Sequence, residues 1–164
     1  MPALNRAATG AATRPTSATQ ELELIEQAIR VLERRMFRRG KQLKNPQQMG
    51  QYLRLKLGRH RHEVFAVIFL DAMLRVIAFE ELFQGSVNSA SVQPRVILQR
   101  AMHHNAVNVV LSHNHPSGNT EPSVADRRIT VQLKLLLSQV DVHVLDHIIV
   151  GKGTPYSLAQ AGLI

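Results

Sequence analysis

The sequence contains no cysteine and no tryptophan, and aromatic residues make up 4% of its 164 positions. Without cysteine there is no disulfide bond, thiolate ligand or thiol nucleophile, so any chemistry must come from histidine, carboxylate, serine or lysine side chains. No apolar run reaches the length of a signal-peptide core or of a membrane span. We therefore expect a cytoplasmic protein without membrane contact, built around one hydrophobic core.

Acidic residues are scarce in the first part of the chain. Residues 1–62 hold 13 Lys and Arg against 4 Asp and Glu, whereas residues 63–164 hold 7 against 8. The upstream excess is densest in R-R-M-F-R-R-G-K, which begins at Arg34, and this segment predicts either contact with nucleic acid or an acidic partner, or a solvated helix end. Phe37 is the one aromatic residue within it, which argues against a groove that stacks single-stranded bases.

Two helices are predicted in this basic region. Apolar residues recur at helical spacing over residues 22–36, and Gly40 ends the pattern. The apolar faces of both predicted helices would cover either the core or a second copy of the chain in a homodimer. Asn45 as cap and Pro46 as first residue predict a shorter helix that ends at Gly58.

Further along the chain, apolar runs and alternating patterns predict strands that are separated by helices. The predicted strands cover residues 64–70, 75–83, 107–112, 142–151 and 156–158, and the predicted helices cover residues 94–104 and 122–140. Hairpin signals accompany the helices, so the alternation is not that of a regular parallel winding. We predict an α/β fold in three layers, with a mixed β-sheet sandwiched by helices.

The densest group of chemically active side chains lies in the stretch S-H-N-H-P-S-G-N-T-E-P-S-V-A-D. His113 and His115 follow a predicted strand at positions i and i+2, which point to the same side of extended backbone. Pro122 in the first turn of the next helix would place Ser123 and Asp126 on one helical face, with the carboxylate turned back toward the imidazoles. The alternative for the histidines is that they bind backbone groups. Ser123 and Asp126 could also cap the helix, a role that is compatible with the catalytic one.

Two imidazoles and one carboxylate leave the fourth position of a tetrahedral ion open, as in catalytic zinc sites, with Mn²⁺, Ni²⁺ and Co²⁺ as alternative ions. Water bound at that position has a pKa near about 7 and supplies a hydroxide nucleophile. Ser123, at a helix N-terminus, is the predicted donor to the oxyanion. Glu63, at the entrance of the first buried strand, is the predicted general base, and Glu80 and Glu81 compete for that role. A nuclease is disfavoured, because metal sites that cleave phosphodiesters generally contain more carboxylates.

The motif H-N-H-P, six residues, S, two residues and D, which starts at His113, resembles the signature of the JAB/MPN (JAMM) metalloproteases. The letters H-N-H-P-S-G and P-S-V-A-D resemble the RadC branch of that family. The resemblance continues in F-L-D, E-L-F-Q-G-S-V-N, Q-P-R-V-I and L-D-H-I-I-V-G, and thus covers the chain from about Arg61 to the C-terminus.

This resemblance implies a cytidine-deaminase-like α/β fold and a Zn²⁺ ion bound by His113, His115 and Asp126. It also implies the oxyanion role for Ser123 and the base role for Glu63. RadC-like proteins usually carry a helix-hairpin-helix DNA-binding module upstream, and its G-x-G hairpins are not found between residues 21 and 58. We accordingly divide the chain into a disordered tail (1–19), basic N-terminal helices (20–60) and a JAB/MPN-type metal-binding domain (61–164).

These features together predict a RadC-like zinc-dependent metallohydrolase that cleaves a peptide or isopeptide bond in a protein or peptide substrate. The alternative prediction is a metal-containing, largely non-catalytic module of DNA repair or recombination that binds nucleic acid through its basic helices. Asp146 and His147 interrupt an apolar strand and need partners if they are buried. Either they support the metal site or they satisfy each other.

Overall fold

The computed structural model describes residues 17–37, 42–43, 45–85 and 92–164. The helices are α1 (Ala18–Met36), α2 (Pro46–Leu57), α3 (Pro94–His103) and α4 (Val124–Ser138), and the strands are β1 (Val64–Leu70), β2 (Val76–Gln84), β3 (Asn108–Asn114), β4 (His143–Val150) and β5 (Tyr156–Ser157). Each strand and helix predicted from the sequence is present, with ends shifted by a few residues. In the described part of the chain, no helix combines the length and the apolar character that a membrane crossing requires.

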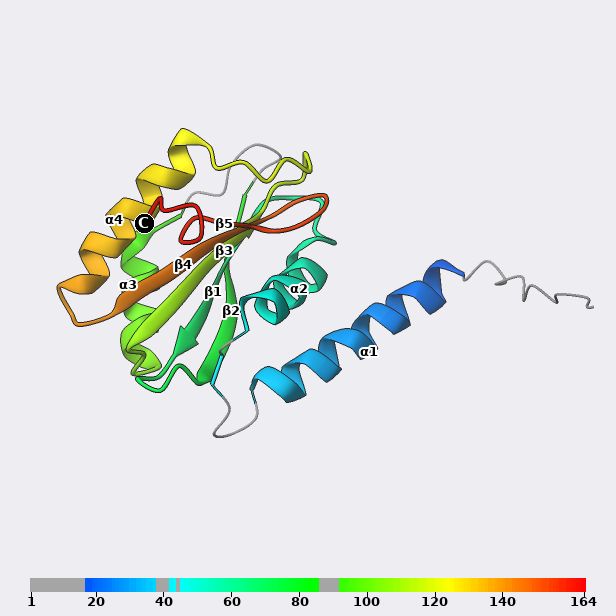
Figure 1. Ribbon diagram of the computed structural model, residues 1–164, viewed down its shortest axis with the longest axis horizontal. Coiled ribbons are helices and arrows are strands. Elements are labelled where there is room, and N and C mark those ends of the chain that lie inside the picture. The colour runs from blue at the N-terminus through cyan, green and yellow to red at the C-terminus, as the bar shows by residue number, and fades with distance from the viewer. Residues whose placement is uncertain (1–16, 38–41, 44, 86–91) are drawn as a thin grey trace, which may run out of the picture.

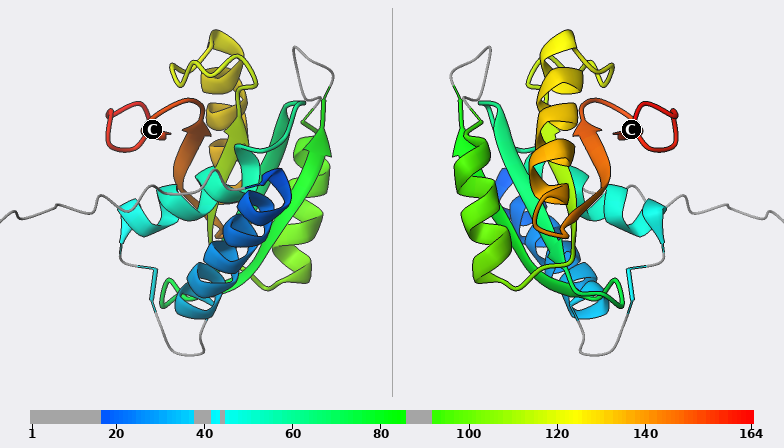
Figure 2. Two further views of the ribbon diagram at one scale, coloured as in Figure 1. Left: turned by 90° about the vertical axis from the view of Figure 1, so that its right-hand side faces the viewer. Right: turned by 90° about the vertical axis from the view of Figure 1, so that its left-hand side faces the viewer.

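The strands form one mixed sheet in the order β2-β1-β3-β4-β5. Strand β1 is antiparallel to both of its neighbours, and β3 is parallel to β4. Helices α1 and α2 cover one face of this sheet, and α3 and α4 cover the other (Figures 1 and 2). The predicted three-layer α/β fold is therefore confirmed. Strand β1 is buried along its whole length, as its apolar residues on both faces predict.

Helix α2 is part of the core of this domain. Its residues Tyr52, Leu53 and Leu57 are fully buried against the sheet. The Tyr52 ring packs edge-on to Phe37 at 5.7 Å and to Phe79 at 5.4 Å, so one side chain joins the end of α1, α2 and β2. The structural unit consequently extends upstream of residue 61, where the sequence placed the start of the metal-binding domain.

The starts of the two N-terminal helices follow from their caps. Ser17 and Gln20 form a reciprocal capping box, so α1 begins at Ala18, within the stretch predicted as a tail. The rest of that tail and the predicted helix end at Gly40 lie outside the described residues. The side chain of Asn45 accepts hydrogen bonds from two backbone N–H groups of α2, as predicted.

The packing of α2 predicts a large loss of stability when its buried side chains are truncated. We expect Leu53→Ala to lower the free energy of unfolding by about 2–5 kcal/mol, because it leaves a cavity in the core. The matched control is Leu24→Ala on α1, because this leucine is 63% exposed. We expect the control to change the free energy of unfolding by less than about 0.5 kcal/mol. Urea denaturation measures both; equal losses would contradict the packing of α2 described above.

Candidate metal centre

The first two predicted ligands come from the end of β3, the central strand with neighbours on both sides. β3 extends to Asn114, beyond the predicted end at Ser112, so His113 lies within the sheet and is 1% exposed. His115 follows directly, and its backbone N–H donates to Val150 O on β4 at 2.8 Å. Both histidines thus leave the same face of one strand, as the i and i+2 spacing predicts.

The third ligand is held by the start of α4. The predicted place of Pro122 in the first helical turn is wrong: Ser123 is the N-cap and α4 begins at Val124. Ser123 Oγ accepts from the Asp126 N–H at 3.1 Å and donates to Asp126 Oδ2 at 2.6 Å. The Ser123 N–H also donates to Oδ2, at 2.7 Å. Ser123 and Asp126 thus cap the helix, and the same capping box fixes the carboxylate toward the histidines.

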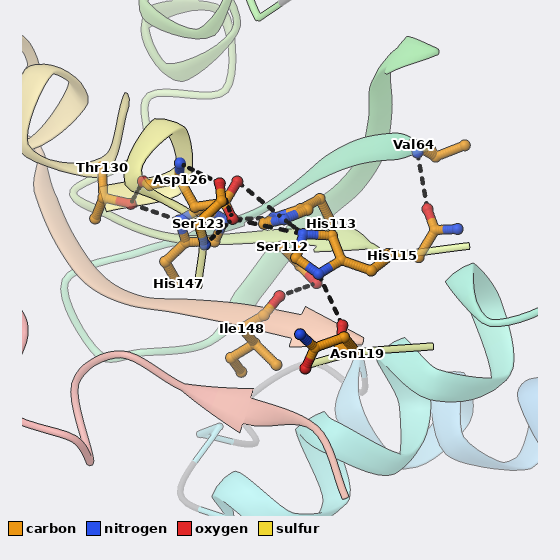
Figure 3. A network of polar contacts seen from close by, with 11 residues as sticks. Val64, Ser112, His113, His115, Asn119, Ser123, Asp126, Thr130, His147 and Ile148 are labelled. Atoms are coloured by element: carbon orange, nitrogen blue, oxygen red, sulfur yellow. Dashed lines mark hydrogen bonds and ion pairs between the residues drawn. The ribbon is translucent and has the colours of Figure 1, made fainter. Parts of the chain in front are cut away.

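The three side chains converge (Figure 3). The Nε2 atoms of His113 and His115 lie 2.9 Å apart. One carboxylate reaches both, with Asp126 Oδ1 at 3.2 Å from His113 Nε2 and Oδ2 at 3.5 Å from His115 Nε2. Ligand atoms of a tetrahedral zinc site with bonds of about 2.0–2.1 Å are separated by about 3.3 Å. The donor set and its spacing therefore fit a tetrahedral divalent ion.

The outer side of this group is open. The side chain of His113 is 1% exposed, whereas those of His115 and Asp126 are 16% and 12% exposed. His115 Nδ1 lies 2.7 Å from the Asn119 carbonyl, which can only accept, so the ring donates there and keeps its Nε2 lone pair for the site. This arrangement suits three protein ligands with a fourth position that a small molecule can reach.

Charge within the group favours the anionic aspartate and the protonated histidine. Burial would raise the pKa of Asp126, but contact with the His113 and His115 rings outweighs it and holds that pKa well below its usual range. The hydrogen bond to Asp126 raises the pKa of His115, burial opposes the shift, and the charge of Glu63 adds to the rise. A metal ion at this site must therefore compete with a proton on His115.

Glu63 stands next to the ligand group without belonging to it. In the antiparallel pairing of β1 and β3, Phe65 lies opposite His113, which brings Glu63 toward His115 at the end of the same two strands. The side-chain amide of Asn114 fixes this segment on both sides of Glu63: it accepts from the Val64 N–H at 2.7 Å and donates to the His62 carbonyl at 3.0 Å. The backbone of Glu63 is thus fixed at the end of the strand, and its half-buried side chain lies near enough for its charge to act on His115.

The two competing carboxylates lie elsewhere. Glu80 binds Arg100 through both oxygens and His104 at 2.7 Å, and the hydrogen bond from Arg100 is the main cause that lowers the pKa of Glu80 to about 2. Glu81 lies opposite Ala66, on the sheet face that α2 covers. The metal group occupies the other face, so Glu81 is not placed to serve it, and Glu80 is engaged by Arg100 and His104.

One residue next to the ligands carries no recognisable signal in the sequence. Thr130 reaches the site through buried hydrogen bonds to His147 and to the Asp126 carbonyl, yet a threonine inside a helix is common. For Asp146 and His147 the sequence left two roles open. His147 contacts His113 at 2.8 Å, whereas Asp146 binds the C-terminal segment through Ser157 Oγ and the Ala159 N–H.

A family model described as the RadC-like JAB domain matches residues 43–163. The chain belongs to this family. An Azotobacter vinelandii protein named "UPF0758 protein" is 50% identical over 148 residues, which are 90% of this chain and 66% of that protein. A Vibrio cholerae protein of the same name is 49% identical over 87% of this chain and 89% of its own length. The chain spans 66% of the length of the Azotobacter relative, and the names of these relatives state no activity.

The charge coupling within the site predicts a change in the titration of His115. We expect Asp126→Asn to lower the pKa of His115 in metal-free protein, because the variant removes the carboxylate that stabilises the protonated ring. The imidazole NMR signals, followed against pH after chelation, measure this pKa. Asp141→Asn, in the exposed turn before β4, is the control and should leave it unchanged. An unaltered His115 titration in the Asp126 variant would contradict the contact.

Proposed function

We propose that the protein is a zinc-dependent hydrolase that cleaves a peptide or isopeptide bond. The observation that carries this proposal is the convergence of His113, His115 and Asp126 at an open site, with Glu63 held beside it. Three ligands of this type favour Zn²⁺ at a catalytic rather than a structural site. Membership of the RadC-like JAB domain family supports the same conclusion.

The chain's own residues divide the work as follows. When bound, the ion supplies a Lewis acid that polarises the scissile carbonyl and makes water nucleophilic at neutral pH. Glu63 accepts the proton of the attacking water and passes it to the leaving nitrogen as the C–N bond breaks. Ser123 donates to the developing oxyanion. Because its one hydroxyl proton rests on Asp126 Oδ2 in this structure, the hydroxyl must rotate toward the substrate for this role.

Metal content tests the ligand set. We expect protein purified without added metal to hold near-stoichiometric zinc by plasma mass spectrometry, and His115→Ala to lose it, because two remaining ligands bind zinc weakly. His103→Ala is the matched control, since this exposed histidine in the last turn of α3 is remote from the ligand group. Absence of zinc from the unaltered protein, even after zinc is supplied, would remove the proposed mechanism.

The base assignment is tested by removing one charge. We expect Glu63→Gln to retain zinc and to lower the turnover of an isopeptide-linked or peptide fluorogenic library by about 10²- to 10⁴-fold, the usual contribution of a positioned base. Glu81→Gln is the control, because that carboxylate lies on the opposite face of the sheet. Full turnover by the zinc-loaded Glu63 variant, on a substrate that the unaltered protein cleaves, would refute the role of Glu63.

Contact with nucleic acid through the basic helices stays a prediction. Arg34 and Arg35 are exposed in the last turn of α1, which is consistent with it. Lys56 on α2 is bound to Glu33 at 2.9 Å and is less available for phosphate contact. The homodimer also stays a prediction. Ile29 of the apolar stripe on α1 packs into the core of its own chain, so this residue is not available to a second copy.

A further inference from the structure

A bulge in β4 turns His147 toward the metal group. The pairing of β3 with β4 shifts register between Val109 and Val110, so Leu145 is an extra residue in β4. Before the bulge, Val144 packs in the core under α3 and α4; after it, Ile148 packs in the core under α2. The shift therefore reverses the alternation of faces, and His147 lies on the face of His113.

His147 joins two of the ligands through a chain of buried hydrogen bonds (Figure 3). Its Nε2 lies 2.8 Å from His113 Nδ1, and its Nδ1 lies 2.6 Å from Thr130 Oγ1. Thr130 Oγ1 in turn lies 2.5 Å from the backbone carbonyl of Asp126, one helical turn earlier. The chain thus begins at one ligand and ends at another, across α4, β4 and β3.

The position of each proton follows from the carbonyl at one end of this chain. The Asp126 carbonyl can only accept, so Thr130 donates its single hydroxyl proton there. Thr130 Oγ1 must then accept from His147 Nδ1–H. His147 is fully buried and neither of its two ring contacts is an anion, so the ring is neutral and has no proton left for Nε2. His113 Nδ1–H donates to that atom, and the lone pair of His113 is fixed on Nε2, facing His115 and Asp126.

The opposite direction of donation is unfavourable. It would bring Thr130 Oγ1 and the Asp126 carbonyl oxygen to 2.5 Å without a proton between them. It would also move the proton of His113 to Nε2, the atom that lies within 3.2 Å of Asp126 and 2.9 Å of His115 Nε2. A ring protonated at Nε2 cannot bind a metal ion through that atom.

We propose that Thr130 and His147 are positioning residues of the metal centre: their hydrogen bonds set the tautomer and the orientation of His113. The proposal rests on the metal site of the proposed function, and it adds residues that are not themselves ligands. Outer partners of this kind raise metal affinity because they prepare the ligand before the ion arrives. Ser112 offers a comparison, since its buried hydroxyl also joins β3 to β4, through Ile148 O at 2.8 Å, but does not contact a ligand side chain.

Zinc affinity of the full chain, measured by competition with a chromophoric chelator, tests the relay. We expect Thr130→Val and His147→Phe to bind Zn²⁺ about 10- to 100-fold more weakly than the unaltered protein. Thr130→Ser restores the hydroxyl and should restore the affinity. Ser112→Ala removes a buried hydroxyl without touching the relay and should bind as the unaltered protein does. Unchanged affinity in the near-isosteric Thr130→Val would overturn the proposal, even if the His147 variant failed to fold.

The tautomer itself gives a second, independent test. In the long-range ¹H–¹⁵N spectrum of the zinc-loaded chain we expect the proton of His147 on Nδ1, and a proton on Nε2 would refute the relay. Failure of the site as a whole has a different signature. If His115→Ala bound Zn²⁺ as tightly as the unaltered protein, the ligand set would be wrong and the relay with it. If His115→Ala lost zinc while Thr130→Val and His147→Phe bound it as the unaltered protein does, the ligand set would stand and the relay would be refuted.

Discussion

The site depends on the burial of two neighbouring polar side chains at the end of the central strand. His113 and Asn114 are 1% and 2% exposed, and a buried polar group without a partner costs about 1–3 kcal/mol. Each one is met by a neighbouring strand: the histidine by β4, and the amide by the backbone at the start of β1. These bonds align the strand ends, and through them the histidines and Glu63.

The ligands themselves could be predicted because their geometry is local. His113 and His115 need only an extended backbone to share a side, and Asp126 needs only the first turn of a helix to be held by Ser123. The layers of the fold were predictable for a similar reason, since β1 is apolar on both faces and must lie between helices. Periodicity and capping act over a few residues, and the sequence displays them directly.

What could not be predicted depends on strand register. Glu63, Glu80 and Glu81 are the same type of residue, and the pairing of β1 with its two neighbours decides which one approaches His115. The role of His147 depends on an extra residue in β4, whereas strict alternation would have put that ring on the other face. The placement of α2 in the core stayed one of two alternatives, because its apolar face shows that the helix packs, but not whether it packs against the sheet or a second chain.

The candidate ligands differ in how firmly the fold holds them: those on the inner side of the site are fixed more firmly than the one on the outer side. His113 is enclosed, stacked beside Phe65 and bonded to His147, and Asp126 is fixed by its capping box. His115 depends on the loop carbonyl of Asn119 and is the most exposed of the three. Order on the inner side would maintain the coordination geometry of a bound ion, and the more exposed outer side leaves access for a substrate of the proposed hydrolase. Its scissile carbonyl would then arrive past His115, at the end of the site where Glu63 lies.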